Sequence, residues 1–177
     1  MTRTTHIIAG VFATILLLAA PAAAGWKFEE FMNPEGDRGI GITLAPANAT
    51  GVELAFGCQG ARWRQVAILP DGPKPLRLAS DGRVSLGFSP DKLTPDGEWK
   101  VRERSDVRAY FAPSASSFMG RLFDAERANP NATLYVVLRP AKKAPITLEF
   151  PIAGLRDALR KHIWEDCKLA DYYGDLD

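Results

Sequence analysis

The chain contains only two cysteines, Cys58 and Cys167, and their wide separation constrains its fold more than any other feature. A bond between them would close a loop of about 110 residues, which by chain entropy alone stabilises a folded domain by about 4–5 kcal/mol. Disulfides persist in oxidising compartments and are rare in the cytosol. The cellular compartment of the protein therefore determines whether the two cysteines form a disulfide or remain free thiols.

The N-terminus predicts export. Residues 1–6 are short and basic, Ile7–Ala20 is largely apolar, and Ala22 and Ala24 occupy the small-residue positions before a cleavage site. This pattern is typical of a secretory signal peptide cleaved after Ala24. The alternative is an uncleaved membrane anchor, which needs about 20 apolar residues, more than this segment has. We expect a periplasmic or secreted protein with no stable membrane insertion after cleavage.

In an exported chain an even number of cysteines favours a disulfide, so we predict a Cys58–Cys167 bond. A catalytic redox pair is one alternative, but these cysteines lack the Cys-x-x-Cys spacing of such pairs. A metal site formed by both cysteines and His162 is another. Zinc sites take three or four ligands, usually with some of them close in sequence, and no such spacing occurs here. We expect no metal.

Short segments that alternate apolar and polar residues predict antiparallel strands between residues 39 and 111. Asp-Gly pairs separate several of them, because this pair tolerates the positive φ of tight hairpin turns. One pair, Asp81-Gly82, joins predicted strands at 76–79 and 83–88. Another, Asp96-Gly97, introduces a single predicted strand at 98–104.

A helix is predicted after Pro113. Phe118, Leu122 and Ala125 would share its buried face. Ser114 or Ser116 is placed to cap its N-terminus, and Asn129-Pro130 is placed to end it.

Two apolar strands follow this helix, at 132–138 and 146–150, and a second helix begins at Leu155. Its apolar residues recur at helical spacing through to the cysteine, at Leu155, Ala158, Leu159, Ile163 and Cys167. We therefore expect one helix that carries Cys167 on its buried face.

These segments predict a mainly β (α+β) fold. We expect an antiparallel β-sandwich or open barrel of about eight to nine strands, with one mid-chain helix and a C-terminal helix. The expected organisation is a signal peptide at 1–24, one β-rich domain at 25–170 and a flexible acidic tail at 171–177.

Charge and motifs argue against several classes of function. Basic and acidic residues number 22 and 21, so the chain lacks the strong positive charge typical of nucleic-acid-binding domains. His162 is the only histidine after Ala24, and no serine lies in a Gly-x-Ser-x-Gly elbow that it would serve as base. No phosphate-binding glycine loop, calcium loop or His-Glu-x-x-His motif occurs. We expect no enzyme activity and no cofactor.

Several arginines and aromatic residues predict an interaction surface, because such residues are enriched in binding hot spots. Trp164 lies about a quarter-turn from the apolar face of the last helix, where it would either cover the disulfide or stand exposed as an anchor. The predicted surface consists of Trp164, Arg102, Arg104, Arg108, Tyr172 and Tyr173.

The order of elements in the last third carries a resemblance to known proteins. A helix with Phe118 and Leu122 precedes two strands, a Gly154-Leu155 turn leads into a second helix, and Cys167 follows. This resembles small exported proteobacterial proteins of the invasion-associated locus B type and periplasmic accessory proteins found near type VI secretion genes. The resemblance implies a periplasmic β-rich fold with a disulfide and carries over no catalytic residue.

The expected function is that of a non-enzymatic exported module that binds a protein or a cell-envelope component. One alternative is a periplasmic inhibitor or immunity-type protein that blocks a cognate enzyme. A second alternative is a small hydrolase that uses His162 or a pair of carboxylates.

Overall fold

The computed structural model describes residues 25–32, 38–59, 63–70, 83–104, 107–139 and 144–174. The expected signal peptide, the predicted strand at 76–79 and the Asp81-Gly82 turn lie outside the described residues.

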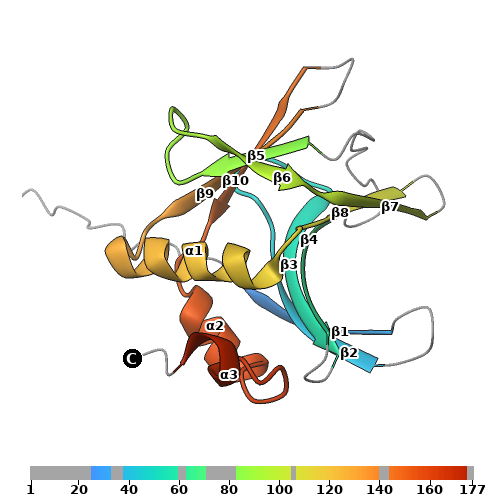
Figure 1. Ribbon diagram of the computed structural model, residues 1–177, viewed down its shortest axis with the longest axis vertical. Coiled ribbons are helices and arrows are strands. Elements are labelled where there is room, and N and C mark those ends of the chain that lie inside the picture. The colour runs from blue at the N-terminus through green and yellow to red at the C-terminus, as the bar shows by residue number, and fades with distance from the viewer. Residues whose placement is uncertain are drawn as a thin grey trace, which may run out of the picture.

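Two open antiparallel sheets form the domain (Figure 1). The six-stranded sheet has the order β1-β2-β3-β4-β8-β7 and the four-stranded sheet the order β10-β9-β5-β6. The first sheet contains β1 (Lys27–Met32), β2 (Arg38–Leu44), β3 (Val52–Gln59), β4 (Trp63–Pro70), β7 (Lys100–Arg104) and β8 (Val107–Phe111). The second contains β5 (Arg83–Gly87), β6 (Thr94–Glu98), β9 (Thr133–Leu138) and β10 (Ile146–Pro151).

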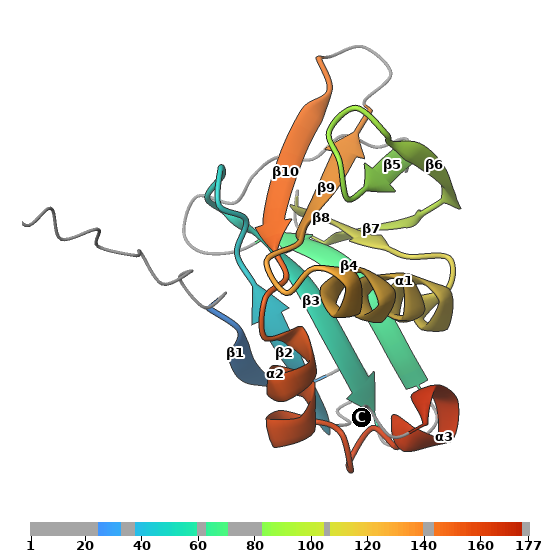
Figure 2. The same ribbon diagram turned by 90° about the vertical axis from the view of Figure 1, so that its left-hand side faces the viewer.

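Three helices complete the described structure, α1 (Ala115–Ala128), α2 (Leu155–His162) and α3 (Ala170–Tyr173). Figures 1 and 2 show α1 lying across the concave side of the six-stranded sheet, with α2 and α3 below it. The predicted mainly β (α+β) class is confirmed, and the sheets are open rather than closed into a barrel.

The prediction of a single strand at 98–104 after an Asp96-Gly97 turn is wrong. Gly97, with φ 72°, lies inside β6, and the chain leaves one sheet for the other at Trp99. Trp99 is only 1% exposed, its Nε1 donates to Asp96 Oδ2 at 2.9 Å, and its ring packs edge-on against Phe118. Asp96 also pairs with Arg121 of α1, so the crossover is fixed to the helix.

The predicted limits of the mid-chain helix are confirmed. The Ser114 hydroxyl accepts a hydrogen bond from the Ser117 amide at 3.2 Å, which satisfies one of the unpaired donors of the first turn. Asn129 follows the last residue in extended conformation. Phe118 and Leu122 are buried as expected.

A buried ion pair joins α1 to α2. The carboxylate of Glu126, only 6% exposed, accepts from the backbone amide and from the Nε of Arg156, each at 3.2 Å. Removing one partner of such a pair leaves an uncompensated buried charge, so the two helices depend on each other.

The outer edge of β10 is covered by the connection between β2 and β3. The Ala47 amide donates to the Glu149 carbonyl at 2.7 Å. The Asn48 side chain donates to the Thr147 carbonyl at 3.1 Å and accepts from the Glu149 amide at 3.0 Å. An unpaired sheet edge invites pairing with other chains, and this loop closes the edge while linking the two sheets.

We predict that Asn48→Ala lowers the free energy of unfolding by about 1–2 kcal/mol, because two side-chain hydrogen bonds to β10 are lost. Denaturant unfolding followed by tryptophan fluorescence measures the change. Asn131→Ala is the matched control, since that side chain is exposed and unfolding should be unaffected. Equal stability of the Asn48→Ala variant and the wild-type protein would contradict a stabilising role for the hydrogen bonds between Asn48 and β10.

Candidate functional site

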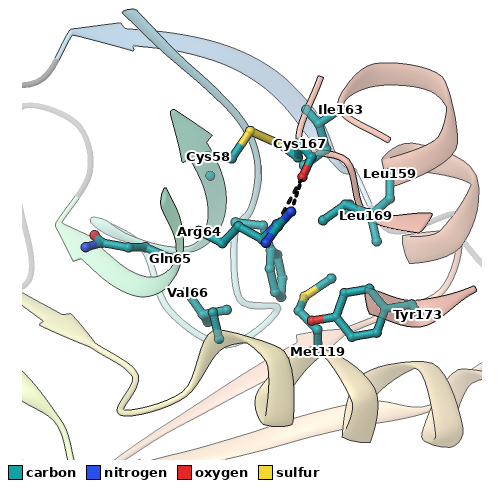
Figure 3. Close-up of a pocket in the computed structure, with 13 residues that line it drawn as sticks. Cys58, Arg64, Gln65, Val66, Met119, Leu159, Ile163, Cys167, Leu169 and Tyr173 are labelled. Atoms are coloured by element: carbon teal, nitrogen blue, oxygen red, sulfur yellow. Dashed lines mark hydrogen bonds between the residues drawn. A yellow bond between two sulfur atoms is a disulfide. The ribbon is translucent and has the colours of Figure 1, made fainter. Parts of the chain in front are cut away.

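The Cys58–Cys167 disulfide is present, as the sequence predicts. Its Cα atoms are 5.6 Å apart, and both cysteines are 1% exposed. The bond connects β3 with the segment that follows α2 (Figure 3). Disulfides persist in oxidising compartments, so this one is consistent with an extracytoplasmic protein.

The expectation that one helix carries Cys167 is wrong. Helix α2 ends at His162, Ile163 is its C-cap, and residues 163–169 form turns. Leu155, Leu159, Ile163 and Cys167 are nevertheless buried. The apolar spacing is thus preserved although the helix is not, because the chain must bend to bring Cys167 against β3.

Arg64 of β4 fixes this bend. Its Nε and Nη2 donate to the Cys167 carbonyl at 3.0 and 2.8 Å, and Nη2 also donates to the Lys168 carbonyl at 3.2 Å. Lys168 has φ 48°, a left-handed conformation that a non-glycine residue adopts at some cost. Arg64 lies opposite Cys58 in the β3–β4 register, so the disulfide and the guanidinium secure the same turn (Figure 3).

Tyr172 lies over Arg64 on the outside of the molecule. The guanidinium carbon is 3.7 Å from the ring centroid, and Tyr172 is 56% exposed. Because hydrogen bonds to the turn already hold Arg64, this cation–π contact holds an exposed aromatic ring in a defined position.

Tyr173 anchors the same short helix to the domain. Its ring packs edge-on against Phe123 with centroids 5.0 Å apart, and its hydroxyl donates to the Ser116 carbonyl at 3.3 Å. Burial raises the pKa of this phenol above its ordinary value of 10.0, and the side chain of Ser116 offsets part of that rise by hydrogen bonding that favours the phenolate. The ordered domain therefore extends beyond Ala170 into the expected tail, whose last residues, 175–177, lie outside the described chain.

The hollow behind the disulfide is too small for a substrate. Its volume is about 20 Å³, roughly the space of one water molecule. Cys58, Arg64, Met119, Leu159 and Tyr173 are among its lining residues (Figure 3). The lining is mostly apolar, as in a packed core.

The residues of the predicted interaction surface do not come together. Arg102, Arg104 and Arg108 lie on β7 and β8 at one edge of the six-stranded sheet, away from α3 in both views (Figures 1 and 2). Arg102 is exposed, and its guanidinium lies 4.9 Å from the Phe111 ring centroid. The side chains of Arg104 and Arg108 lie outside the described part of the structure.

Trp164 is half-buried and packs against the core, while Tyr172 and Tyr173 lie on α3. The essential partner of Tyr172, Arg64, was not among the predicted surface residues. Arg64 lies opposite Cys58 in the β3–β4 pairing, and that register is the sequence signal for its role.

His162 is the last residue of α2 and contacts β1. Its ring is half-buried and stacks on Phe28 of β1 with centroids 5.3 Å apart. Glu165 and Asp166, the nearby carboxylates in sequence, are exposed. Across the described ranges, no group of three or more histidine, cysteine, aspartate or glutamate side chains is placed to hold a metal ion.

Comparisons of this chain with protein-family models, with curated proteins and with solved structures gave no match. Among the helices that the structure describes, none has the length and apolar character needed to cross a membrane.

Removing the disulfide should destabilise the domain by up to about 4–5 kcal/mol, because the unfolded chain regains the entropy of a loop of 109 residues. The Cys58→Ala/Cys167→Ala double variant tests this by denaturant unfolding, compared with the wild-type protein with and without reductant. Mass spectrometry after alkylation provides the control for the wild-type bond. Two alkylated thiols in the exported, unreduced protein, or unchanged stability of the double variant, would refute the prediction.

Proposed function

We propose that this protein is an exported, non-enzymatic module that binds a partner protein through the surface formed by Arg64 and Tyr172. The observation that carries the proposal is the exposed Tyr172 ring held 3.7 Å above a guanidinium that is itself hydrogen-bonded to the chain. Aromatic residues held rigidly before binding lose little side-chain entropy in a complex, and tyrosine and arginine are enriched in binding hot spots.

The charges around Tyr172 indicate the chemistry of the partner. Three carboxylates are exposed in the same segment, those of Glu165, Asp166 and Asp171, against two cations, the exposed Lys168 and the Arg64 guanidinium beneath the ring. A surface of net negative charge around a central aromatic anchor fits a partner with an apolar pocket and a basic rim. Complementary charge of this kind increases the association rate and disfavours partners of like charge.

Export forms part of the proposal. The N-terminal pattern is typical of a cleaved signal peptide, and the disulfide is consistent with an oxidising compartment, so we place the protein in the periplasm or outside the cell. A partner would accordingly be another exported protein or the exposed part of an envelope protein.

The setting of His162 supports a binding role over the hydrolase alternative. A catalytic histidine needs a nucleophile within hydrogen-bond reach and a pocket for substrate. The His162 ring instead stacks on Phe28, and it does not line the hollow behind the disulfide. A His162→Ala variant should therefore retain partner binding.

We predict that Tyr172→Ala weakens binding of the partner by about thirtyfold or more, because loss of a hot-spot side chain costs about 2 kcal/mol or more of binding free energy. A photo-crosslinking phenylalanine analogue at position 172 should give a discrete adduct in intact cells, and the Tyr172→Ala protein should recover less of the same partner. Phe88→Ala is the matched control, because Phe88 is also an exposed aromatic residue, at 38% against 56% for Tyr172.

Two results would overturn the proposal. One is equal recovery of the partner by the Tyr172→Ala and wild-type proteins. The other is the absence of any adduct from position 172 when the variant is exported and oxidised normally.

A further inference from the structure

A groove lies where the end of α1 meets the start of β9. Its volume is about 420 Å³, within the range of about 300–1,000 Å³ that small-molecule sites occupy. None of its lining residues belongs to the Arg64–Tyr172 surface. The groove is therefore a candidate site separate from the proposed protein-binding surface.

Two aromatic residues line the groove. Thr133 and Tyr135 of β9 are half-buried, whereas Leu134 and Val136 between and beyond them are buried, so the strand turns the first pair away from the core. Phe88 follows β5 directly and is 38% exposed, although it is a large apolar side chain. Phe88 and Tyr135 thus offer aromatic surface to whatever occupies the groove.

The polar side of the groove is a rigid turn. The Asn129 amide donates to the Ala125 carbonyl at 2.9 Å, and the Asn129 carbonyl accepts from Ala132 at 2.9 Å. The Asn129 side-chain oxygen accepts from the Asn131 amide at 3.0 Å. These three bonds fix the turn before any ligand arrives, so little ordering is needed on binding.

Several hydrogen-bonding groups of the groove are available to a ligand. Asn131, Thr133 and Tyr135 line it, and their polar side-chain groups form no hydrogen bond with another residue in the described part of the chain. Amide and hydroxyl groups both donate and accept hydrogen bonds. The groove can therefore pair with a ligand that carries many hydroxyl groups.

No charged residue is among the described residues that line the groove. Among the described residues that line it, the polar ones are asparagine, threonine and tyrosine, and the remainder are alanine and phenylalanine. It also lies at the C-terminal end of α1, where the helix dipole is negative and disfavours anions. Phosphorylated and carboxylated ligands are accordingly poor candidates.

We infer that this groove binds a neutral saccharide. The faces of aromatic rings are electron-rich and attract the polarised C–H groups on the face of a sugar ring, while amides and hydroxyls pair with its hydroxyl groups. Phe88 and Tyr135 supply the first kind of contact, and Asn131 and Thr133 supply the second. The sugar is either a free oligosaccharide or a unit of a neutral envelope polysaccharide.

The first test is titration of the oxidised exported protein with neutral hexose and N-acetylhexosamine oligosaccharides, followed by NMR chemical shifts and calorimetry. We expect binding of at least one neutral series at millimolar concentration or below, with weaker binding of uronic-acid oligosaccharides of the same length. Purified neutral envelope polysaccharide forms a parallel arm. Binding of that polymer without binding of free oligosaccharides identifies the polymer as the ligand, and competition between the two identifies a shared unit.

Three variants locate the site. Phe88→Ala removes an exposed ring and should weaken saccharide binding about tenfold, the equivalent of about 1.4 kcal/mol. Asn131→Ala should weaken it less, and Tyr172→Ala should leave it unchanged. Failure of every neutral probe to bind, preference for the acidic series, or unchanged affinity of Phe88→Ala would overturn the inference. None of these results would affect the proposed partner binding, which depends on Tyr172.

Discussion

The bend at Cys167 is held by two different interactions, and the position of the C-terminal segment depends on both. The disulfide ties Cys167 to β3 and acts mainly by restricting the unfolded chain. The Arg64 guanidinium acts in the folded state, because it donates hydrogen bonds to two carbonyls in the turns that follow α2. Since Tyr172 stacks on the same guanidinium, the structural bend and the exposed ring are parts of one arrangement.

The two sheets are joined at places where local pattern gives no indication of a junction. At Trp99 the chain crosses from β6 to β7, and the indole is buried with its nitrogen bonded to Asp96. At Asn48 a loop of the six-stranded sheet pairs with the edge of β10. At the second junction the Asn48 side chain replaces backbone partners that the edge of β10 lacks. At the first, the Asp96 side chain fixes the crossover through the Trp99 indole and Arg121.

Sequence periodicity correctly predicted features that depend on neighbouring residues, such as helix caps. It failed where contacts between distant segments determine the path of the chain. The caps of α1 at Ser114 and Asn129 follow from local hydrogen bonding, and they were found as predicted. The alternation of apolar and polar residues in 98–104 predicts one strand, because this alternation can continue across the point where the chain passes from one sheet to the other. The spacing of Leu155, Leu159, Ile163 and Cys167 likewise persists through the turns after α2, because burial is required there whether or not the chain is helical. The groove combines residue 88 with residues 125–135, so no single stretch reveals it.

The Arg64–Tyr172 surface and the groove rest on different parts of the fold, and this makes two separate binding roles physically reasonable. Reducing the disulfide would free the turn that carries the Cys167 and Lys168 carbonyls, and it would thereby loosen Arg64 and the ring above it. The groove is built from the end of α1, the Asn129 turn and the pairing of β9 with β5, and none of these includes a cysteine. A partner protein and a neutral saccharide would therefore bind independently, with binding free energies that add. Coupling between the two sites would require a movement of α1, since the contact between Tyr173 and Phe123 connects α3 to that helix.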